Sequence, residues 1–341
     1  MSRLAVVTGA SGFVGGAVAR HLVEGGFRVR AIARSRAAAA AIASILDGDG
    51  RRSPIEVVEG DVLDGGSLDD AFAGADVVVH SAGVVEACRR DPSAMLRTNV
   101  IGTSNAVTAA GRAGTARMVV TSSAATIGER AGEVGREDTV HRGWFLSAYE
   151  RSKTEAESVA FALGRDLGVD VVSVNPASVQ GPGRADGTAR ILLAAARGRL
   201  PVFVRSTISF VDIDDCGRGH VLAAERGVGG ERYVLCGATL RTDAALELLR
   251  RVTGRRVRSV ALPPPVVSTA AGMVEALSGL VRRDPPFCRE VAAAIVHGRA
   301  YDGSKATREL GLEYTPVRET IRRTLDWLER SGRLRSAGTG G

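Results

Sequence analysis

The first half of the chain alternates short aliphatic runs with longer stretches of helical periodicity, and this alternation restricts the fold more than any other feature. The runs are rich in Val, Ile, Leu and Ala and too short for helices, as is typical of strands buried on both faces. Strands are predicted at residues 4–8, 29–33, 55–59, 77–80, 118–121 and 171–174. Helices are predicted between them at residues 12–24, 67–72, 92–113 and 148–167. This order indicates an α/β Rossmann fold, with a doubly wound parallel sheet and right-handed crossovers.

After residue 180 the pattern changes to Pro, Gly and Arg, followed by mostly helical segments. Helices are predicted at residues 191–197, 216–225, 243–253, 266–281, 286–297 and 317–330. A short apolar segment lies at 209–215, and a strand-like segment lies at 233–236. We therefore predict a dinucleotide-binding domain over residues 1–180, to which segments near 205–235 return. Residues 181–331 are predicted to form a smaller, mostly helical substrate-binding region. Residues 332–341 are predicted to be a disordered tail.

Composition excludes several other classes of protein. The chain has 341 residues, of which 45% are hydrophobic and 24% charged, as in a soluble globular protein with a large core. The net charge of +7 comes from arginines scattered among 38 acidic residues, which favours small phosphate-bearing ligands over nucleic acid. No apolar run is long enough to span a membrane, and residues 263–281 are predicted to be a docked amphipathic helix. The five histidines lack metal-ligand spacing, so no metal site is expected.

The cysteines bear on the compartment in which the protein folds. They stand far apart and form no CxxC pair, at Cys88, Cys216, Cys236 and Cys288. No secretion signal is recognisable at the N-terminus. We therefore predict reduced thiols and a cytoplasmic protein.

The turn after the first strand carries a GxxGxxG pattern and opens the first predicted helix. Glycines allow the backbone to turn tightly and to approach a pyrophosphate, which the N–H groups at a helix N-terminus then bind. The candidate cofactor-binding residues in this turn are Gly9, Ser11, Gly12, Phe13, Val14 and Gly15. The strand–turn–helix context predicts a dinucleotide site rather than a plain turn.

Other strand ends add candidates for the same site. No acidic residue stands at the end of the second strand to hold a ribose 2′-hydroxyl, and Arg34 there can pair with a 2′-phosphate. We therefore predict NADP(H) as the cofactor, with NAD(H) as the alternative. Asp61 and Val62 are placed near the adenine, and the end of the fourth strand would pass close to the cofactor at Ser81, Ala82 and Gly83.

Tyr149 and Lys153 are the catalytic candidates, because a spacing of four places both on one face of a helix. An ammonium group near a phenol lowers the pKa of the tyrosine from about 10 toward neutrality, which makes it a usable proton donor to a carbonyl. Ser122 and Ser123 end the fifth strand, where one hydroxyl can bind the reacting oxygen. The equally spaced Tyr301 and Lys305 are interpreted as structural, since Gly303 lies between them.

With these features placed, the chain resembles the extended short-chain dehydrogenase/reductase family. The resemblance extends from TGASGFVG at residues 8–15 to the region of residues 326–327. It includes GDVLD at 60–64, HSAG at 80–83, NVIGT at 99–103, TSSAATIG at 121–128, YERSK at 149–153, NPASVQGPG at 175–183 and FVDIDD at 210–215. The later segments SAYERSKTEAE, GERYVLCGATL and SKATRELGLEYTP resemble the dihydroflavonol-reductase-like branch, which includes hopanoid-associated sugar-epimerase-like proteins.

The resemblance implies several site residues. Ser123 corresponds to the family serine, because it lies five residues before Gly128, and Ser122 would then line the cofactor. Asn99 matches the asparagine that helps to place the lysine. The nicotinamide side would be covered by Pro176, Ala177 and Val179. Family members also pair through two helices of the sheet domain, so we expect a homodimer through residues 92–113 and 148–167.

Three departures weaken sugar-nucleotide chemistry. Ile208 stands where epimerases of the family carry an arginine, Ala124 and Ala125 replace the acidic pair of the dehydratases, and Ile127 replaces a tyrosine. We therefore predict an NADP(H)-dependent reductase of a ketone or aldehyde on a small organic molecule. The alternatives are a nucleotide-sugar epimerase with tightly bound NAD and a non-catalytic redox sensor, which would have no need of the Tyr–Lys–Ser set.

Overall fold

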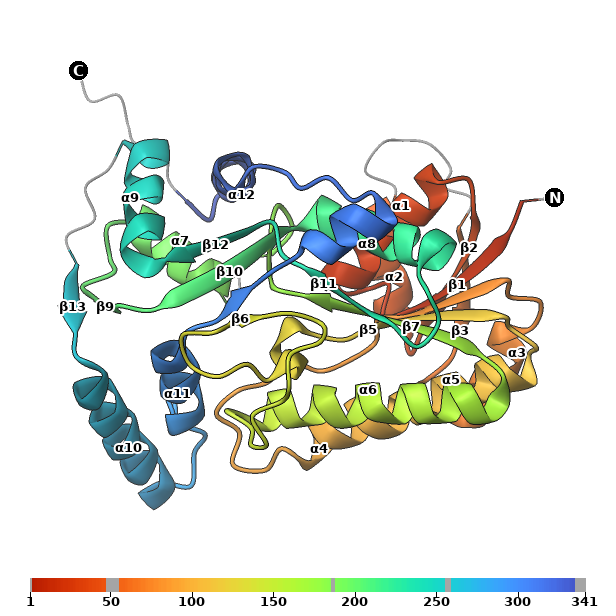
Figure 1. Cartoon of the computed structure of the whole chain (residues 1–341), viewed down its shortest axis with the longest axis horizontal. Helices are drawn as coiled ribbons and strands as arrows, with labels where there is room; N and C mark the ends of the chain where they lie inside the picture. The colour runs from red at the N-terminus through yellow and green to blue at the C-terminus, as the bar shows by residue number, and fades with distance from the viewer. Residues whose placement is uncertain (1, 47–54, 185–187, 255–258, 335–341) are drawn as a thin grey trace.

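A seven-stranded parallel sheet forms the centre of the computed structural model, which describes residues 2–46, 55–184, 188–254 and 259–334 (Figure 1). The strand order is β11-β7-β5-β4-β1-β2-β3. The strands are β1 (Leu4–Thr8), β2 (Arg28–Ala33), β3 (Ile55–Glu59), β4 (Val77–His80), β5 (Arg117–Thr121), β7 (Asp170–Pro176) and β11 (Arg232–Leu235). The predicted doubly wound α/β fold is confirmed, with all six predicted strands in the sheet. The seventh strand, β11, comes from the later part of the chain.

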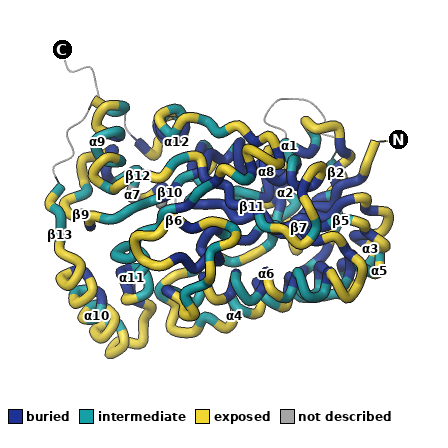
Figure 2. The backbone as a smooth tube through the Cα atoms, in the orientation of Figure 1, coloured by how far each residue is buried: buried dark blue, intermediate teal, exposed yellow. Residues whose placement is uncertain are grey.

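Two helical layers cover the sheet because successive strand residues point to opposite faces. Val7 packs into a cluster with α1 (Phe13–Glu24), α2 (Arg36–Leu46) and α8 (Ile213–Arg226). Val6 packs on the other face, with α3 (Gly65–Phe72), α5 (Gly102–Arg112) and α6 (Ala148–Leu167). Figure 2 shows the sheet as the buried centre of the molecule. The helix α2 was not predicted.

The helix predicted over residues 92–113 is interrupted. It consists of α4 (Ser93–Leu96), a π-helical turn η2 (Arg97–Ile101) and α5. Such π-turns shift the following side chains around the helix axis and occur often at functional sites. Here the turn carries Asn99, which is buried.

The C-terminal half forms small sheets and helical clusters beside the edge of the main sheet at which its strands end. A three-stranded sheet joins β8 (Ser178–Gln180), β10 (Thr207–Asp212) and β12 (Ala238–Arg241), and a separate apolar cluster holds α7 (Thr188–Ala196), α9 (Thr242–Thr253) and α12 (Val317–Arg330). The remaining elements are η3 (Ala124–Ile127), β6 (Val134–Gly135), β9 (Val202–Val204), β13 (Val260–Leu262), α10 (Pro264–Leu280), α11 (Arg289–His297), β14 (Ala300–Tyr301) and η4 (Ala306–Leu310).

The prediction of a disordered tail from residue 332 is wrong at its start. Residues 332–334 continue the turn after α12, and Leu334 is buried in the cluster of α7, α9 and α12. The rest of the predicted tail, residues 335–341, lies outside the described residues. Within the described ranges, no helix combines the length and the apolar character that crossing a bilayer requires.

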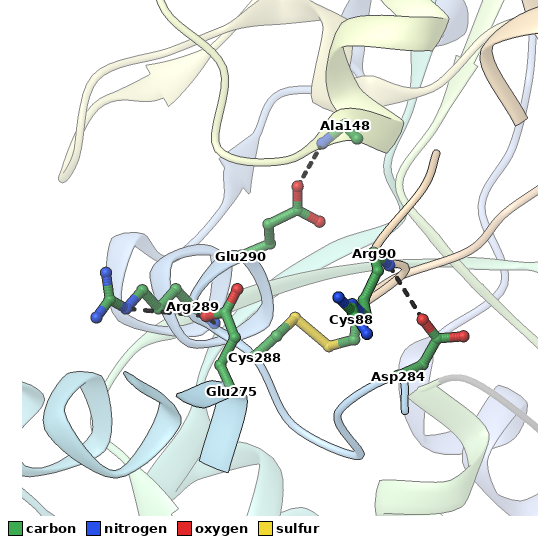
Figure 3. Close-up of a disulfide and its surroundings, with 8 residues drawn as sticks. All are labelled: Cys88, Arg90, Ala148, Glu275, Asp284, Cys288, Arg289 and Glu290. Carbon is green, nitrogen blue, oxygen red and sulfur yellow. Dashed lines mark hydrogen bonds and ion pairs between the residues drawn. A yellow bond between two sulfur atoms is a disulfide. The ribbon is translucent and has the colours of Figure 1, made fainter. Parts of the chain in front are cut away.

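A disulfide joins two segments that are 200 residues apart in the chain (Figure 3). Cys88, in the loop after β4, is bonded to Cys288, which precedes α11. Asp284 supports the same junction, since its carboxylate accepts hydrogen bonds from the Arg89 side chain at 2.8 Å and the Arg90 N–H at 3.0 Å. The prediction of reduced thiols is therefore wrong for this pair, because sequence spacing does not reveal contacts between distant segments. Cys216 and Cys236 are free and buried.

Removing this disulfide is expected to lower the free energy of unfolding by about 2–4 kcal/mol, because the crosslink closes a very long loop in the unfolded chain. Urea unfolding of Cys88→Ser/Cys288→Ser, compared with the wild type, measures the effect. A reductant should bring the wild type down to the stability of the double variant and leave that variant unchanged. Equal stabilities under oxidising conditions would contradict the prediction.

Candidate active site

The predicted phosphate turn lies between β1 and α1 at the carboxyl edge of the sheet. Gly9 has a φ of +74°, and a Cβ at this position would lie 2.6 Å from the backbone nitrogen of Ala82. A Cβ on Gly15 would collide with the carbonyl oxygen of Gly9. Gly12 caps α1 without a side-chain hydrogen bond, so the N–H groups of the first helical turn remain available. The turn therefore has the shape and the partial positive charge that a pyrophosphate requires.

Two buried hydroxyl groups at neighbouring strand ends fit the same ligand. Neither the Oγ of Ser81, after β4, nor the Oγ of Ser122, after β5, has a hydrogen-bond partner among the described residues. Unsatisfied buried hydroxyls are costly unless a ligand or water completes them. They lie in the two strand ends beside which the sequence predicts the dinucleotide, so the residues present fit such a cofactor.

His80 forms hydrogen bonds to the strand end that leads into the phosphate turn, and it was not predicted as part of the site. Its Nδ1 lies 2.9 Å from the Thr8 hydroxyl and its Nε2 lies 3.1 Å from the Thr103 hydroxyl. Burial and the nearby Lys153 ammonium lower the pKa of His80 to about 3. The imidazole is thus neutral and serves as a hydrogen-bonding bridge between β1, β4 and α5.

The residues predicted at the adenosine end lie after β2 and β3. Arg34 is exposed directly after β2. The Asp61 carboxylate forms a hydrogen bond within its own loop, in which Oδ1 accepts from the N–H of Leu63 at 2.9 Å. Val62 is buried. The end of β2 itself carries no acidic residue, although Glu59 on β3 pairs in register with Ala33, and the exposed guanidinium of Arg34 is compatible with a 2′-phosphate.

Asn99 reaches from the π-turn to the backbone after β4. Its Oδ1 accepts from the Val84 N–H at 2.7 Å, and its Nδ2 donates to the Val84 carbonyl at 3.0 Å. The same Nδ2 donates to the Ser152 hydroxyl at 2.9 Å, next to Lys153. Asn99 therefore links the segment that begins with Gly83 to the second turn of α6.

Tyr149, Lys153 and Ser123 meet where α6 passes the end of β5. Ser123 caps η3, with its Oγ accepting from the N–H of Ala125 at 3.2 Å. Tyr149 lies in the first turn of α6 and Lys153 one turn later. The Nζ of Lys153 donates to the carbonyl oxygen of Thr121, the last residue of β5, at 2.6 Å.

The expected lowering of the tyrosine pKa is not found. Burial raises the pKa of Tyr149 above its ordinary value, and this effect exceeds the opposing ones. The opposing influences are a hydrogen bond with Ser123 and the positive charges of Arg299 and Arg184. The pKa of Lys153 is itself lowered by burial to about 8, with Glu157 acting against the shift. The arrangement thus holds a protonated phenol beside the Ser123 hydroxyl, with the buried Lys153 one helical turn away and bonded to the end of β5.

A buried polar network lies one turn of α6 beyond Lys153, around Glu157, and was not predicted from the sequence. Glu157 accepts hydrogen bonds from Ser173 at 2.5 Å and from the Nδ2 of Asn175 at 2.7 Å, and it pairs with Arg232 at 2.8 Å. Asn175 also donates to the Thr126 hydroxyl at 2.9 Å, directly after the Ser123 segment. One signal was present, because Glu157 follows Lys153 by four residues on the same face of α6.

The first turn of α6 is held by a second buried cluster, also missed. Glu150 is fully buried and pairs with Arg142 through one oxygen and with Arg299 through the other, the latter at 2.8 Å. Arg142 belongs to the loop before α6, and Arg299 comes from the segment before β14. At the start of the helix, the N–H of Ala148 donates to the carboxylate of Glu290 in α11 at 3.0 Å. The C-terminal region thus anchors the helix at the residues on either side of Tyr149.

The residues predicted to cover the nicotinamide lie at the end of β7, which contains Pro176, and in β8, which contains Val179. Ala177 is buried between them, with its N–H donating to the Leu235 carbonyl at 2.9 Å. Nearby, the guanidinium of Arg184 lies 5.8 Å from the ring centre of Phe13 in the phosphate turn. These contacts bring the segment after β8 against the start of α1.

Tyr301 and Lys305 form no second pair of this kind. Lys305 donates to Glu231 at 2.5 Å and to the Arg232 carbonyl at 3.0 Å. The hydroxyl of Tyr301 instead accepts from Arg299 at 2.9 Å.

A Rossmann sheet with this site defines the chain as an NAD(P)-dependent enzyme. It belongs to the NAD dependent epimerase/dehydratase family, whose model matches residues 5–236, and the resemblance to extended short-chain dehydrogenases/reductases is confirmed.

Two relatives match along almost the whole chain. Sterol demethylase protein B of Methylococcus capsulatus is 31% identical over 339 residues, which cover 96% of this chain and 99% of that protein. Cinnamoyl-CoA reductase 1 of Petunia hybrida is 26% identical over 343 residues, covering 96% and 92% respectively.

Solved structures agree with the fold along almost the whole chain. The crystal structure of gox2253 has a TM-score of 0.84 at 30% identity and covers 98% of this chain and 100% of its own. PA4631, a nucleoside-diphosphate-sugar epimerase from Pseudomonas aeruginosa, has a TM-score of 0.75 at 25% identity, with coverage of 98% and 99%.

Proposed function

We propose that the protein is an NADP(H)-dependent reductase that converts a ketone or aldehyde of a small organic molecule into an alcohol. The observation that carries this proposal is the hydrogen bond between the Tyr149 phenol and the Ser123 hydroxyl at the carboxyl edge of the sheet. The relation to cinnamoyl-CoA reductase supports carbonyl reduction.

In this reaction the bound nicotinamide dinucleotide supplies the hydride. Tyr149 donates its proton to the carbonyl oxygen as negative charge develops there, and its raised pKa keeps the phenol protonated at neutral pH. Ser123 donates a hydrogen bond to the same oxygen and holds it in place. Lys153 stabilises the phenolate that the transfer leaves behind, and Asn99 holds the Ser152 side chain, next to the lysine, through a hydrogen bond to its hydroxyl.

The residues that would hold the dinucleotide are those of the Gly9–Gly15 turn, the orphaned hydroxyls of Ser81 and Ser122, and Arg34 for a 2′-phosphate. Initial rates of NADPH and NADH oxidation across a panel of carbonyl compounds test both the reaction and the coenzyme. Turnover with NADPH, and loss of its advantage over NADH in Arg34→Ala, are the expected results. A panel that gives no turnover with either coenzyme would contradict the proposed reaction.

The rate of reduction is expected to fall as the pH rises through about 8, because Lys153 then loses the charge that stabilises the phenolate. Below this pH the ammonium is present and kcat/KM for the carbonyl substrate should stay level. In Lys153→Arg the guanidinium remains charged, so the alkaline fall should move to higher pH even if the rate is lower overall. A pH profile unchanged in this variant would contradict the assignment.

The second candidate function is that of a nucleotide-sugar epimerase, which the family description and the structure of PA4631 favour. Such an enzyme would carry tightly held NAD and consume no NADPH. Against it, Ile208 lies on β10 at the position of the family arginine, and the nearby Arg205 is exposed outside that strand. Purified protein with stoichiometric NAD, interconverting sugar nucleotides without net oxidation, would favour the epimerase.

A further inference from the structure

The helix α10 presents an apolar stripe to solvent. Its members and the residue that follows it are exposed to 50%, 58%, 65%, 81% and 64% at Val266, Met273, Leu277, Leu280 and Val281. The spacing of seven, four and three places Val266, Met273, Leu277 and Leu280 on one face of the helix, and Val281 follows directly after its end. Figure 2 shows the length of α10 largely exposed at the periphery of the molecule.

The exposed stripe is a second apolar face, because the opposite side of α10 is already packed. Val267 and Ala271 are buried in a cluster with Ala292 of α11. The junction between the two helices is in turn fixed to the sheet domain by the Cys88–Cys288 disulfide. The stripe therefore stays on the surface of a well-anchored helix pair.

Charge is distributed unevenly around the stripe. Glu275 is the only acidic residue of α10, and its carboxylate accepts from the N–H of Arg289, away from the stripe. Arg282 and Arg283 follow the stripe directly and are exposed. Among the described residues, neither of these two guanidiniums forms an ion pair. The apolar surface thus ends in two exposed arginines, followed by Asp284, whose carboxylate pairs with Arg89.

The size of the stripe bears on what covers it. A helix of 17 residues is about 26 Å long, and a stripe about 10 Å wide along it offers about 250 Å². A stable protein interface needs about 800 Å² from each partner. The stripe is thus too small to hold a second copy of this chain or another folded protein by itself. A bilayer surface needs no matching shape, since apolar side chains enter the acyl boundary while arginines bind lipid phosphates.

We propose that α10 docks this protein on the surface of an anionic phospholipid bilayer. The helix lies in the plane of the interface, with Met273, Leu277 and Leu280 inserted and Arg282 and Arg283 on the headgroups. This docking does not depend on which carbonyl compound the enzyme reduces.

Co-sedimentation with vesicles tests the proposal on the full chain. The wild type is expected to bind vesicles of phosphatidylglycerol and phosphatidylcholine in equal parts, and to bind vesicles of phosphatidylcholine alone more weakly. In Leu277→Ser/Leu280→Ser, binding should fall by about tenfold or more. In Arg282→Gln/Arg283→Gln, it should fall by about fivefold for each arginine, and only on the anionic vesicles.

The matched controls are Val228→Ser, an exposed valine after α8, and Arg318→Gln, an exposed arginine at the start of α12. Both should bind as the wild type does, and circular dichroism should show all variants folded. The proposal would be overturned if the wild type bound neither kind of vesicle. It would also be overturned if the wild type and the stripe variants bound equally well. A dimer, seen by light scattering, that Leu277→Ser/Leu280→Ser dissociates would overturn it as well.

Discussion

Replacing Tyr149 with phenylalanine is expected to lower kcat for carbonyl reduction by about 10²–10⁴-fold, because the reacting oxygen loses its proton donor. The aromatic ring remains, so packing at the first turn of α6 is kept. The phosphate turn and the strand ends that would hold the dinucleotide are untouched, and the affinity for NADPH should stay nearly unchanged. Steady-state rates and fluorescence titration of NADPH measure the two effects separately.

Tyr314→Phe is a matched control for this change. It removes one buried hydroxyl, which donates to the Gly303 carbonyl at 3.0 Å, and it leaves the site intact. This variant should keep its turnover. Full activity in Tyr149→Phe would show that another group protonates the carbonyl oxygen and would defeat the proposed mechanism.

The sheet could be predicted because each strand carries its own signal. Val6 and Val7 are both buried but on opposite faces, so a strand of this sheet reads as an unbroken aliphatic run. The helix α2 was missed because its sequence, RAAAAAIASIL, has almost no polar residues to mark a second face. The π-turn around Asn99 was missed because residues 92–113 carry one continuous helical pattern.

Some features of the site could likewise be predicted from a single segment of the sequence, whereas others depend on contacts between distant segments. The glycine turn and the spacing of Tyr149 and Lys153 lie within single elements and could be read from the sequence. Glu150, by contrast, stands in YERSK where a solvated helix face is the natural expectation, yet its partner Arg299 lies 149 residues away. Contacts between α6 and the C-terminal region depend on the packing of the whole chain, and so does the raised pKa of Tyr149 that burial causes.

Glu150→Ala is expected to lower the free energy of unfolding by about 3–5 kcal/mol, because it leaves two guanidiniums without their shared carboxylate. The side chains of Glu150 and Arg142 are 0% and 2% exposed, so water is a poor substitute for the lost partner at Arg142, whereas Arg299 is 22% exposed and can be hydrated in part. Chemical denaturation measures the loss. In contrast, Glu155→Ala on the same helix breaks the exposed ion pair with Arg151 and should cost at most about 1 kcal/mol.

Glu150→Gln separates the effect on catalysis from the effect on folding. The amide has the shape of the carboxylate and keeps one acceptor oxygen, so the variant should fold, while its hold on Arg142 and Arg299 weakens. Since Glu150 adjoins Tyr149, kcat should fall while NADPH affinity stays unchanged, because the phenol is less firmly positioned. If Glu150→Ala were no less stable than Glu155→Ala, the buried cluster would not be what anchors the catalytic helix to the C-terminal region.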